Sequence, residues 1–247
     1  MLTDEHFAKL KSFRITAFGS RLREMVADGS LSQMTTEEVI AELICAEEEA
    51  KYSRKVLKLH GAARFAQPTA CMEDVIYLPD RSLDKDYMQR LAHLNFLEEH
   101  DHIIIVSETG CGKSFIAQAL GNAACRALKT VRYIRHPDLC RELNIARKAN
   151  TYYEVIKAFE KVDLLIIDDF FTEPVPEANV TDTFEIVESR VDRGSLIVAS
   201  LIEPDQWHMR IKTKTLADSI IDRIVHRSLF IDLTGPNMRE HLAKMRA

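Results

Sequence analysis

From position 103 onward, apolar residues cluster in short runs of aliphatic and β-branched side chains. These runs are Ile103–Val106, Val131–Ile134, Leu164–Ile167, Leu196–Ala199 and Leu229–Leu233. Helical stretches separate them and begin near Lys113, Pro137, Tyr152, Pro176 and Thr215. Apolar strands that alternate with helices are typical of a parallel sheet covered on both faces. We therefore predict an α/β fold with a parallel sheet between helices.

The N-terminal part of the chain has a different pattern, because it lacks proline and has the character of helices. One amphipathic stretch runs from about Asp4 to Asp28, and Gly29 is suited to cap its C-terminal end. Thr35-Thr36-Glu37-Glu38 matches a capping box, which predicts a helix from there to about Arg64. The pattern predicts a small all-helical region. Its charged surface is either a solvated face or a module that docks a partner, and the sequence leaves both open.

Two proline-containing segments separate this helical region from the α/β pattern. Gln67-Pro68 lies in the first, and Leu78-Pro79-Asp80 forms the second. We therefore divide the chain into a helical partner-docking region at residues 1–66, a linker at 67–80 and a nucleotide-binding domain at 81–247.

Composition limits the classes of function. A formal net charge of -5 gives no global sign of binding to nucleic acid or to an anionic membrane, so any such surface must be local. The 5 cysteines lack C-x-x-C spacing, which indicates reduced thiols rather than a disulfide framework or a zinc site. The longest apolar run, Ile103–Val106, is far shorter than the roughly 20 residues of a membrane helix. We expect a soluble, cytoplasmic protein without a membrane partner.

The first predicted strand leads directly into a phosphate-binding loop. Its residues are Ser107-Glu108-Thr109-Gly110-Cys111-Gly112-Lys113-Ser114, and a helix begins at Lys113, which is the context that a Walker A motif requires. The glycines let consecutive N–H groups face the phosphates, and the helix N-terminus adds its positive dipole end. Lys113 would reach the β- and γ-phosphates of ATP, and the Ser114 hydroxyl would ligate Mg²⁺. The motif's first glycine is Ser107 in this chain. The expected nucleotide-binding residues are Glu108, Thr109, Gly110, Cys111, Gly112, Lys113, Ser114 and Phe115.

A second apolar strand ends in two carboxylates, as a Walker B motif does. The sequence is Asp163-Leu164-Leu165-Ile166-Ile167-Asp168-Asp169. We expect Asp168 to hold Mg²⁺, directly or through water, and Asp169 to polarise the attacking water. Open α/β sheets bind ligands at the carboxyl ends of their strands, which is where both acids stand.

These residues resemble the IstB-like AAA+ ATPases, which assist insertion-sequence transposases and are related to the DnaC helicase loader. The resemblance covers essentially the whole chain and is densest from Asp101 to Arg239. It is carried by Thr109–Ser114, Asp163–Phe170, Gln206-Trp207-His208, Thr215–Arg223 and Gly235–Arg239. It implies a P-loop AAA+ core. Only about fourteen residues follow the last predicted strand, too few for a full C-terminal lid domain.

The resemblance also implies catalytic roles for three residues outside the Walker motifs. Ser200 stands at the sensor 1 position, Arg223 at the arginine finger and Arg239 at sensor 2. An arginine that a neighbouring subunit supplies can stabilise the charge on the γ-phosphoryl oxygens. Without the resemblance, each arginine would be read as part of a surface salt bridge. The chain departs from the family at Leu201, where Asn or Gln is usual, and at Phe171, where glycine is usual.

A basic stretch between positions 126 and 148 is the local candidate for DNA contact. On its predicted helix, Arg141 and Lys148 are seven residues apart and share a face, and Arg147 lies beside them. A row of cations suits contact with phosphates without reading of bases. A solvated helix face is the alternative. The resemblance favours DNA, because such ATPases bind DNA within a ring or helical homo-oligomer.

The sequence thus predicts an ATP hydrolase that oligomerises on DNA and assists a transposase in target selection. A replicative helicase loader of the DnaC type is the nearest alternative. A P-loop kinase of a small metabolite and a nucleotide-binding adaptor without hydrolysis are others. The kinase would need an acceptor pocket, and the intact Lys113, Asp168 and Asp169 argue against the adaptor.

Overall fold

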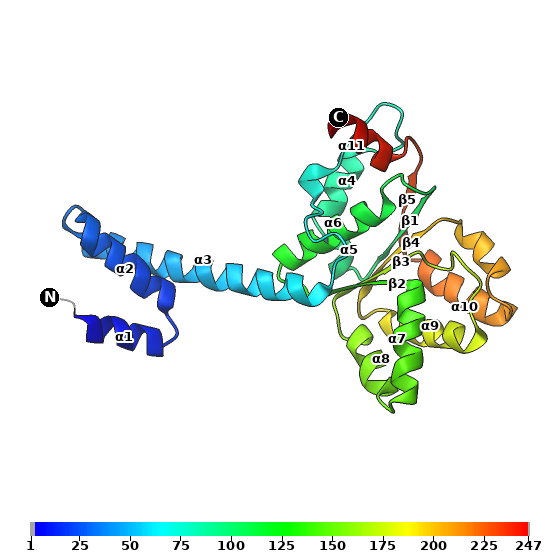
Figure 1. Ribbon diagram of the computed structural model, residues 1–247, viewed down its shortest axis with the longest axis horizontal. Helices are drawn as coiled ribbons and strands as arrows, with labels where there is room; N and C mark the ends of the chain where they lie inside the picture. The colour runs from blue at the N-terminus through cyan, green and yellow to red at the C-terminus, as the bar shows by residue number, and fades with distance from the viewer. Residues whose placement is uncertain (1–2, 247) are drawn as a thin grey trace. The chain divides into compact units, whose positions relative to one another are not determined.

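The computed structural model describes residues 3–246 and contains two compact units, Met1–Lys58 and Leu59–Ala247 (Figure 1). The boundary falls within helix α3 (Thr36–Ala63). Residues 1, 2 and 247, which belong to the predicted outer domains, lie outside the described residues.

The first unit corrects the prediction of one continuous helix from Asp4 to Asp28. Two helices, α1 (Asp4–Ser12) and α2 (Thr16–Asp28), form instead, and Arg14 between them has a left-handed backbone with φ 60. The N–H of Ile15 donates to the carbonyl of Leu10 at 3.2 Å, which closes α1 with the cap geometry usually built around glycine. The predicted cap at Gly29 is confirmed, with φ 77.

A buried carboxylate explains the break between α1 and α2. Glu47 is only 5% exposed and accepts hydrogen bonds from the backbone N–H groups of Ala17 and Phe18 at 2.8 and 3.1 Å. These amides lie in the first turn of α2, where a helix cannot satisfy its own donors. A continuous helix would have used both amides internally. The start of α3 follows the prediction, because Thr35 and Glu38 exchange the hydrogen bonds of a capping box.

The second unit contains the predicted parallel sheet. Its strands are β1 (His102–Ser107), β2 (Val131–Arg135), β3 (Leu164–Asp168), β4 (Ser195–Ser200) and β5 (Ser228–Leu233). Within the described residues they form a single five-stranded sheet in the order β2-β3-β4-β1-β5, and all paired neighbours run parallel. Each strand coincides with one of the predicted apolar runs. Because all strands are parallel, their carboxyl ends share one edge of the sheet.

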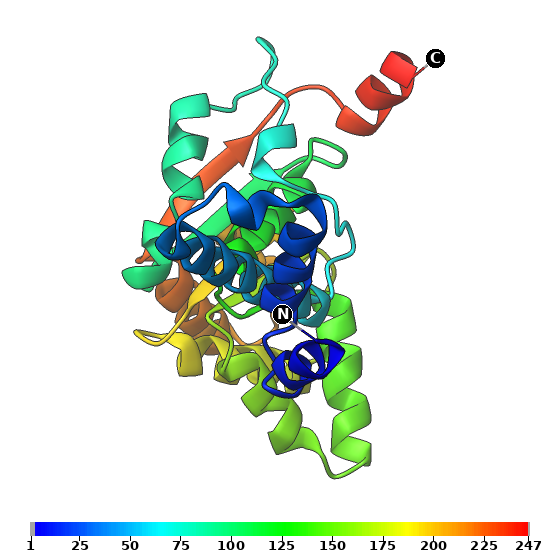
Figure 2. The ribbon, with the colours of Figure 1, turned by 90° about the vertical axis from the view of Figure 1, so that its left-hand side faces the viewer.

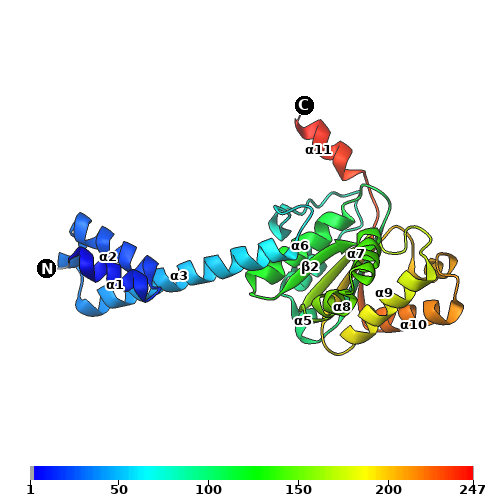
Figure 3. The same cartoon turned by 60° about the horizontal axis from the view of Figure 1, so that its bottom comes forward.

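Helices cover both faces of this sheet (Figures 1 and 3). One face carries α4 (Lys85–Ala92), α5 (Asn95–Glu98) and α6 (Lys113–Arg126). The other carries α7 (His136–Lys148), α8 (Tyr152–Glu160), α9 (Glu177–Arg190) and α10 (Lys214–Val225). The five helices predicted in this unit begin within one residue of their expected positions, whereas α4 and α5 were not predicted.

Short elements complete the second unit. They are the 3-10 turns η2 (Met72–Asp74) and η3 (Pro204–Met209) and the terminal helix α11 (Met238–Arg246). The first unit adds the turn η1 (Ser30–Ser32). Figure 2 shows the chain running from β5 into α11, the one helix that follows the sheet among the described residues. None of the helices described is long and apolar enough to cross a membrane.

Candidate functional site: a nucleotide-binding cleft at the carboxyl edge of the sheet

The loop between β1 and α6 has the backbone that the Walker A motif predicts. Gly110 and Gly112 have φ values of 91 and 101, in the left-handed region that favours glycine. A Cβ on Gly110 would also lie 2.5 Å from the side chain of Asn237. Ser107, at the place of the motif's first glycine, is the last residue of β1 and pairs there with Leu233. A strand residue needs no left-handed backbone, which explains why serine is accommodated.

The two polar residues that open α6 face open space above the loop. Lys113 is 7% exposed, and both Lys113 and Ser114 line two neighbouring cavities of 570 and 400 Å³. Gln67 and Arg239 also line both cavities, so the two form one cleft around the start of α6. The N-terminus of α6 favours negative charge at this point.

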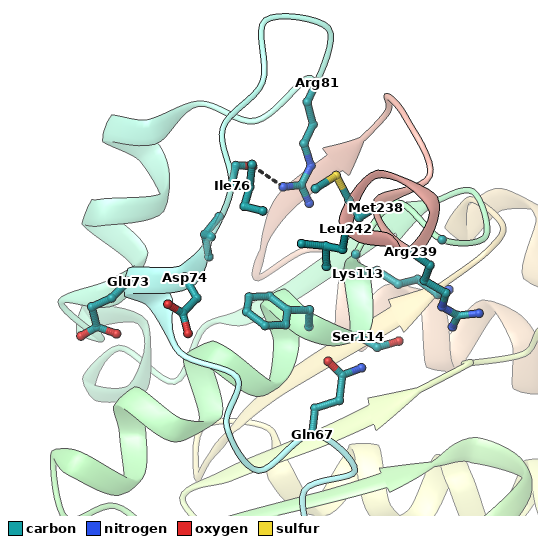
Figure 4. Close-up of a pocket in the computed structure, with 14 residues that line it drawn as sticks. Gln67, Glu73, Asp74, Ile76, Arg81, Lys113, Ser114, Met238, Arg239 and Leu242 are labelled. Carbon is teal, nitrogen blue, oxygen red and sulfur yellow. Dashed lines mark hydrogen bonds between the residues drawn. The ribbon is translucent and has the colours of Figure 1, made fainter. Parts of the chain in front are cut away.

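The larger cavity has an apolar wall. Val75, Ile76, Phe115, Met238 and Leu242 line it, from the segment before the sheet, from α6 and from α11 (Figure 4). The smaller cavity is polar, with Thr109, Tyr133, Asp168 and Asp169 among its lining residues. An apolar space beside a polar one with a lysine between them suits a ligand with a flat base at one end and phosphates at the other.

The predicted loop residues differ in how they meet the cleft. Thr109 and Phe115 line it, as do the two glycines and the first residues of α6. Glu108 is exposed and lines neither cavity. Cys111 is 3% exposed, and its thiol points to the carbonyl of Gly235 at 3.5 Å. Glu108 and Cys111 could therefore contribute only backbone groups to a ligand in the cleft.

Asp168 accepts two hydrogen bonds at the end of β3. The residue is 2% exposed, its Oδ2 accepts from the Tyr133 hydroxyl at 2.9 Å, and its Oδ1 accepts from the Asp169 N–H at 2.9 Å. Burial and the neighbouring carboxylate raise the pKa of Tyr133, so the phenol stays protonated and keeps donating. This arrangement fixes the direction of the carboxylate before any ligand arrives.

Asp169 faces the same cavity in a different environment. Its backbone is left-handed, with φ 52, and its Oδ2 accepts from Arg135 Nε at 2.8 Å. Its side chain is 23% exposed, so water reaches it. Asp168 and Asp169 thus lie together beside Lys113 and Ser114, as the sequence predicts, with one carboxylate buried and the other accessible.

The turn after Asp169 shows why phenylalanine is tolerated where glycine is usual. Phe171 has φ 43, a left-handed value, yet its ring is completely buried. It packs edge-on against His136 and Phe170 at 4.7 and 4.5 Å, and its N–H donates to His136 Nδ1 at 3.4 Å. Burial lowers the pKa of His136 to about 4, so the ring is neutral near pH 7 and Nδ1 can accept. Packing and this hydrogen bond offset the backbone strain.

Ser200, at the proposed sensor 1 position, contacts the Walker B turn. It is completely buried, donates to the carbonyl of Phe170 at 2.9 Å and accepts from the indole N–H of Trp207 at 3.3 Å. Its hydroxyl therefore contacts the turn that carries Asp169, and Ser200 itself lines neither cavity.

The two proposed catalytic arginines lie in different places. Arg239, on α11, lines both cavities together with Lys113 (Figure 4). Arg223, on α10, lines neither cavity, forms an ion pair with Glu188 on α9 and lies 4.9 Å over the ring of Phe184. The structure therefore brings Arg239 to the cleft of its own chain and leaves Arg223 away from it.

The proposed DNA contacts on α7 are partly engaged in ion pairs. Arg141 contacts Asp138 at 2.7 Å, and Arg147 contacts the buried Asp182 at 2.5 Å. Lys148 is exposed, and with Arg141 it lines a 420 Å³ groove that reaches Asp169. Of these three residues, Arg147 has a structural role. Asp182 is 1% exposed, and replacement of Arg147 would leave this buried carboxylate without its cationic partner.

Two residues that contact the Walker B acids belong to no motif of the sequence. Tyr133 lies within a predicted strand, and Arg135 belongs to the basic stretch. Both lie on β2 two residues apart, so their side chains share a face of the sheet, and Arg135 pairs in register with Asp168. The spacing of Tyr133 and Arg135 is evident in the sequence. It indicates contact with the two acids only when β2 is known to lie next to β3.

Comparison with known proteins agrees with this geometry. Residues 8–246 match the family described as IstB-like ATP binding protein. The ATP-binding protein y4pL, named for an insertion sequence of Sinorhizobium fredii (strain NBRC 101917 / NGR234), is 35% identical over 243 residues, which cover 98% of this chain and 98% of the relative.

Solved structures share the fold of the second unit. The crystal structure of the DnaC helicase loader matches with a TM-score of 0.58 at 15% identity, covering 70% of this chain and 100% of that chain. The replication initiator DnaA bound to AMPPCP and single-stranded DNA matches with a TM-score of 0.59 at 20% identity, covering 74% of this chain and 57% of that chain. The α/β unit therefore shares its fold with these two proteins.

Replacing Lys113 with alanine tests the cleft as the ATP site. Removal of the cation should weaken ATP binding by one to two orders of magnitude, because a hydrogen bond to a charged group contributes roughly 1.5–3 kcal/mol. Titration calorimetry on folded protein measures the change. Lys161→Ala, at an exposed lysine outside the cleft, is the matched control. Equal ATP affinity in the Lys113→Ala and Lys161→Ala proteins would remove Lys113 from the nucleotide site.

Proposed function

Because this chain belongs to the IstB-like ATP-binding protein family, we propose that it is an ATPase that assembles on DNA and assists a transposase in target selection. The single observation that carries the ATPase part is the cleft in which Lys113, Ser114, Asp168 and Asp169 meet. The transposition part rests on family membership and on the name of the relative, which describes it as an insertion sequence ATP-binding protein.

In this proposal the base of ATP enters the apolar cavity and the phosphates extend over the loop into the polar one. Lys113, between the two cavities, would neutralise the β- and γ-phosphates. The loop amides and the N-terminus of α6 would bind the phosphate oxygens. Arg239, which lines both cavities from α11, would add a second cation near the γ-phosphate.

The polar cavity also fits Mg²⁺. The Ser114 hydroxyl and the Asp168 carboxylate line it together, and oxygen donors of this kind are those that Mg²⁺ prefers. Asp168 accepts hydrogen bonds on both oxygens, so water between it and the ion suits its environment. When bound, Mg²⁺ would neutralise charge that develops on the β- and γ-phosphate oxygens.

Asp169 is the residue proposed to activate water. It is the more accessible of the two acids, and Arg135 engages only its Oδ2 in the contact described. The carboxylate would orient a water molecule whose oxygen attacks the γ-phosphorus while the bond to the bridging oxygen breaks, giving ADP and phosphate. Ser200 would act on Asp169 through the turn, because its hydroxyl donates a hydrogen bond to the carbonyl of Phe170, the residue after Asp169.

Arg223 is proposed to act on a neighbouring subunit. Its distance from the cleft of its own chain excludes neither assembly nor catalysis, because a finger residue is supplied in trans. Its side chain on α10 is 28% exposed, and a second copy could contact it after exchange of the ion pair with Glu188. Surface ion pairs of this kind contribute only about 0–1 kcal/mol to stability, so breaking the pair with Glu188 would cost little free energy.

The DNA part of the proposal rests on the exposed cations of α7. Arg141 and Lys148 would contact phosphates, with Arg147 beside them, and binding would depend little on sequence. A helicase loader remains the alternative for the partner. Its support is the likeness of fold to DnaC at 15% identity, whereas the insertion-sequence relative is 35% identical over nearly the full length of both chains.

Replacing Asp169 with asparagine separates ATP binding from hydrolysis. ATP and Mg²⁺ should still bind through Lys113, Ser114 and Asp168, while turnover falls because the amide has no negative charge to orient water. Phosphate release and ATP affinity are measured on the same preparation. The control is Asp86→Asn, an exposed acid of α4. Turnover of Asp169→Asn at the wild-type rate would place the catalytic carboxylate elsewhere.

The double variant Arg141→Gln/Lys148→Gln tests the DNA surface. Binding to all DNA sequences should weaken alike, and the slope of log affinity against log salt should flatten by about two, one for each lost phosphate contact. Arg147 is left intact, since its loss would expose Asp182 as an unpaired buried charge. Lys157→Gln/Lys161→Gln, on the exposed surface near α8, controls for net charge. A wild-type slope in the first variant would locate DNA on another surface.

Mixing two inactive variants tests the shared active site. Arg223→Ala should bind ATP but hydrolyse it slowly, and Lys113→Ala should not bind ATP but still offer Arg223 to its neighbour. Their mixture should regain activity at interfaces that pair an intact loop with an intact finger, since a finger supplied in trans contributes ~10³–10⁵ in rate. ATPase rate is measured against mixing ratio with DNA present. Mixing Arg223→Ala with Lys113→Ala/Arg223→Ala is the control, and co-assembly without recovery would reject the shared site.

A further inference from the structure

Arg81 contacts a backbone carbonyl of the phosphate loop. It belongs to the segment before α4, is 8% exposed and lines the larger cavity (Figure 4). Its Nη1 donates to the carbonyl of Ile76 at 2.5 Å, and its Nη2 donates to the carbonyl of Cys111 at 2.7 Å. No sequence motif includes this arginine.

The bond to Cys111 controls the direction of a loop amide. The carbonyl of Cys111 and the N–H of Gly112 belong to one planar trans peptide, so they point in opposite directions. Because Arg81 holds this carbonyl, the Gly112 N–H is directed away from Arg81. An inward N–H at this position is what a loop of this type uses to cradle phosphate.

Two glycines make room for this arrangement. A Cβ on Gly112 would lie 2.8 Å from Nη2 of Arg81, and a Cβ on Gly235 would lie 2.9 Å from the carbonyl oxygen of Asp80 and 3.0 Å from Cα of Arg81. Gly235 has φ 128 and begins the turn that leads to α11. The guanidinium therefore packs between the phosphate loop and the approach to α11, at a place that larger residues would block.

The charge of Arg81 lacks an anionic partner. Both of its acceptors are backbone carbonyls, and among the residues that the structure describes no carboxylate forms an ion pair with it. Its Nε is buried without an acceptor. Burial lowers the pKa of Arg81, but arginine remains charged at neutral pH. A buried cation of this kind is costly unless an anion comes close. The phosphates of a nucleotide would bring negative charge over the phosphate loop, whose Cys111 carbonyl Arg81 contacts.

We propose that Arg81 is a positioning residue of the nucleotide site, which fixes the Gly112 amide toward the phosphates and holds a buried positive charge that bound phosphates compensate. This inference rests on the proposed ATP-binding function and assigns a role to a residue outside the Walker motifs. Arg81 acts through the loop and the electric field, since both of its hydrogen bonds go to backbone carbonyls.

Affinity for AMP, ADP and ATP in Arg81→Met tests the proposal. ADP and ATP should bind about 10- to 100-fold more weakly than to the wild type, because their β-phosphate meets the misdirected amide and the lost charge. AMP, which lacks that phosphate, should change much less. Arg81→Lys keeps the charge but cannot hold both carbonyls, so its affinity should be intermediate. Arg193→Met, at an exposed arginine, is the matched control. Calorimetry gives the affinities, and thermal unfolding without nucleotide checks the fold.

The outcomes distinguish a positioning role from a structural one. Loss of thermal stability with unchanged ADP affinity, or an equal loss for AMP and ADP, would overturn the proposal. If Arg81→Met does not fold, the comparison of Arg81→Lys with wild type decides by the same criterion of ADP against AMP. Lys113→Ala in the same assay distinguishes failure of the Arg81 proposal from failure of the proposed ATP site. If it loses ATP while Arg81→Met binds normally, the inference fails and the ATP site stands. If the wild type binds no nucleotide, both fail.

Discussion

The direction of the peptide groups in the phosphate loop is the constraint on which the rest of the site depends. Amides can face a phosphate only if Gly110 and Gly112 adopt left-handed backbones, and the carbonyls of the same peptides then face the protein. Those carbonyls need donors. The N–H of Met238 donates to the carbonyl of Gly110 at 2.9 Å, and the guanidinium of Arg81 donates to the carbonyl of Cys111. The loop is therefore fastened by segments from both ends of the α/β unit, and one of them leads directly into the helix that carries Arg239.

A second group of contacts fixes the acidic side of the site before a ligand binds. Strand β3 lies between β2 and β4, and both neighbours reach its carboxyl end. Tyr133 of β2 holds Asp168, and Ser200 of β4 holds the turn that follows Asp169. Dipoles that are already oriented require little reorganisation during a reaction, which is the physical advantage of such an arrangement. The parallel sheet provides it, because the ends of adjacent strands meet at one edge.

Ion pairs with acids from other parts of the chain also reduce the positive charge of the basic stretch. Between positions 126 and 148 the sequence shows only two acids, Asp138 and Glu142, and the stretch looks strongly cationic. In the folded chain, acids from distant segments meet three of its arginines: Glu73, Asp169 and Asp182 pair with Arg126, Arg135 and Arg147. The local density of positive charge is therefore lower than the sequence indicates. A cation available for phosphate cannot be recognised until its partners are known.

The sequence by itself determined those features whose physical requirement lies within one short segment. Strands buried on both faces must be continuously apolar, a capping box needs two side chains three residues apart, and a phosphate loop needs its glycines and lysine in a row. The strands, the start of α3 and the Walker residues were therefore predictable. The break at Arg14, the placement of Tyr133 and Arg135 on the two acids and the contact of Arg81 with the loop were not. Each depends on a partner tens of residues away, such as Glu47 for α2 or Cys111 for Arg81, and only the tertiary structure decides which distant groups meet.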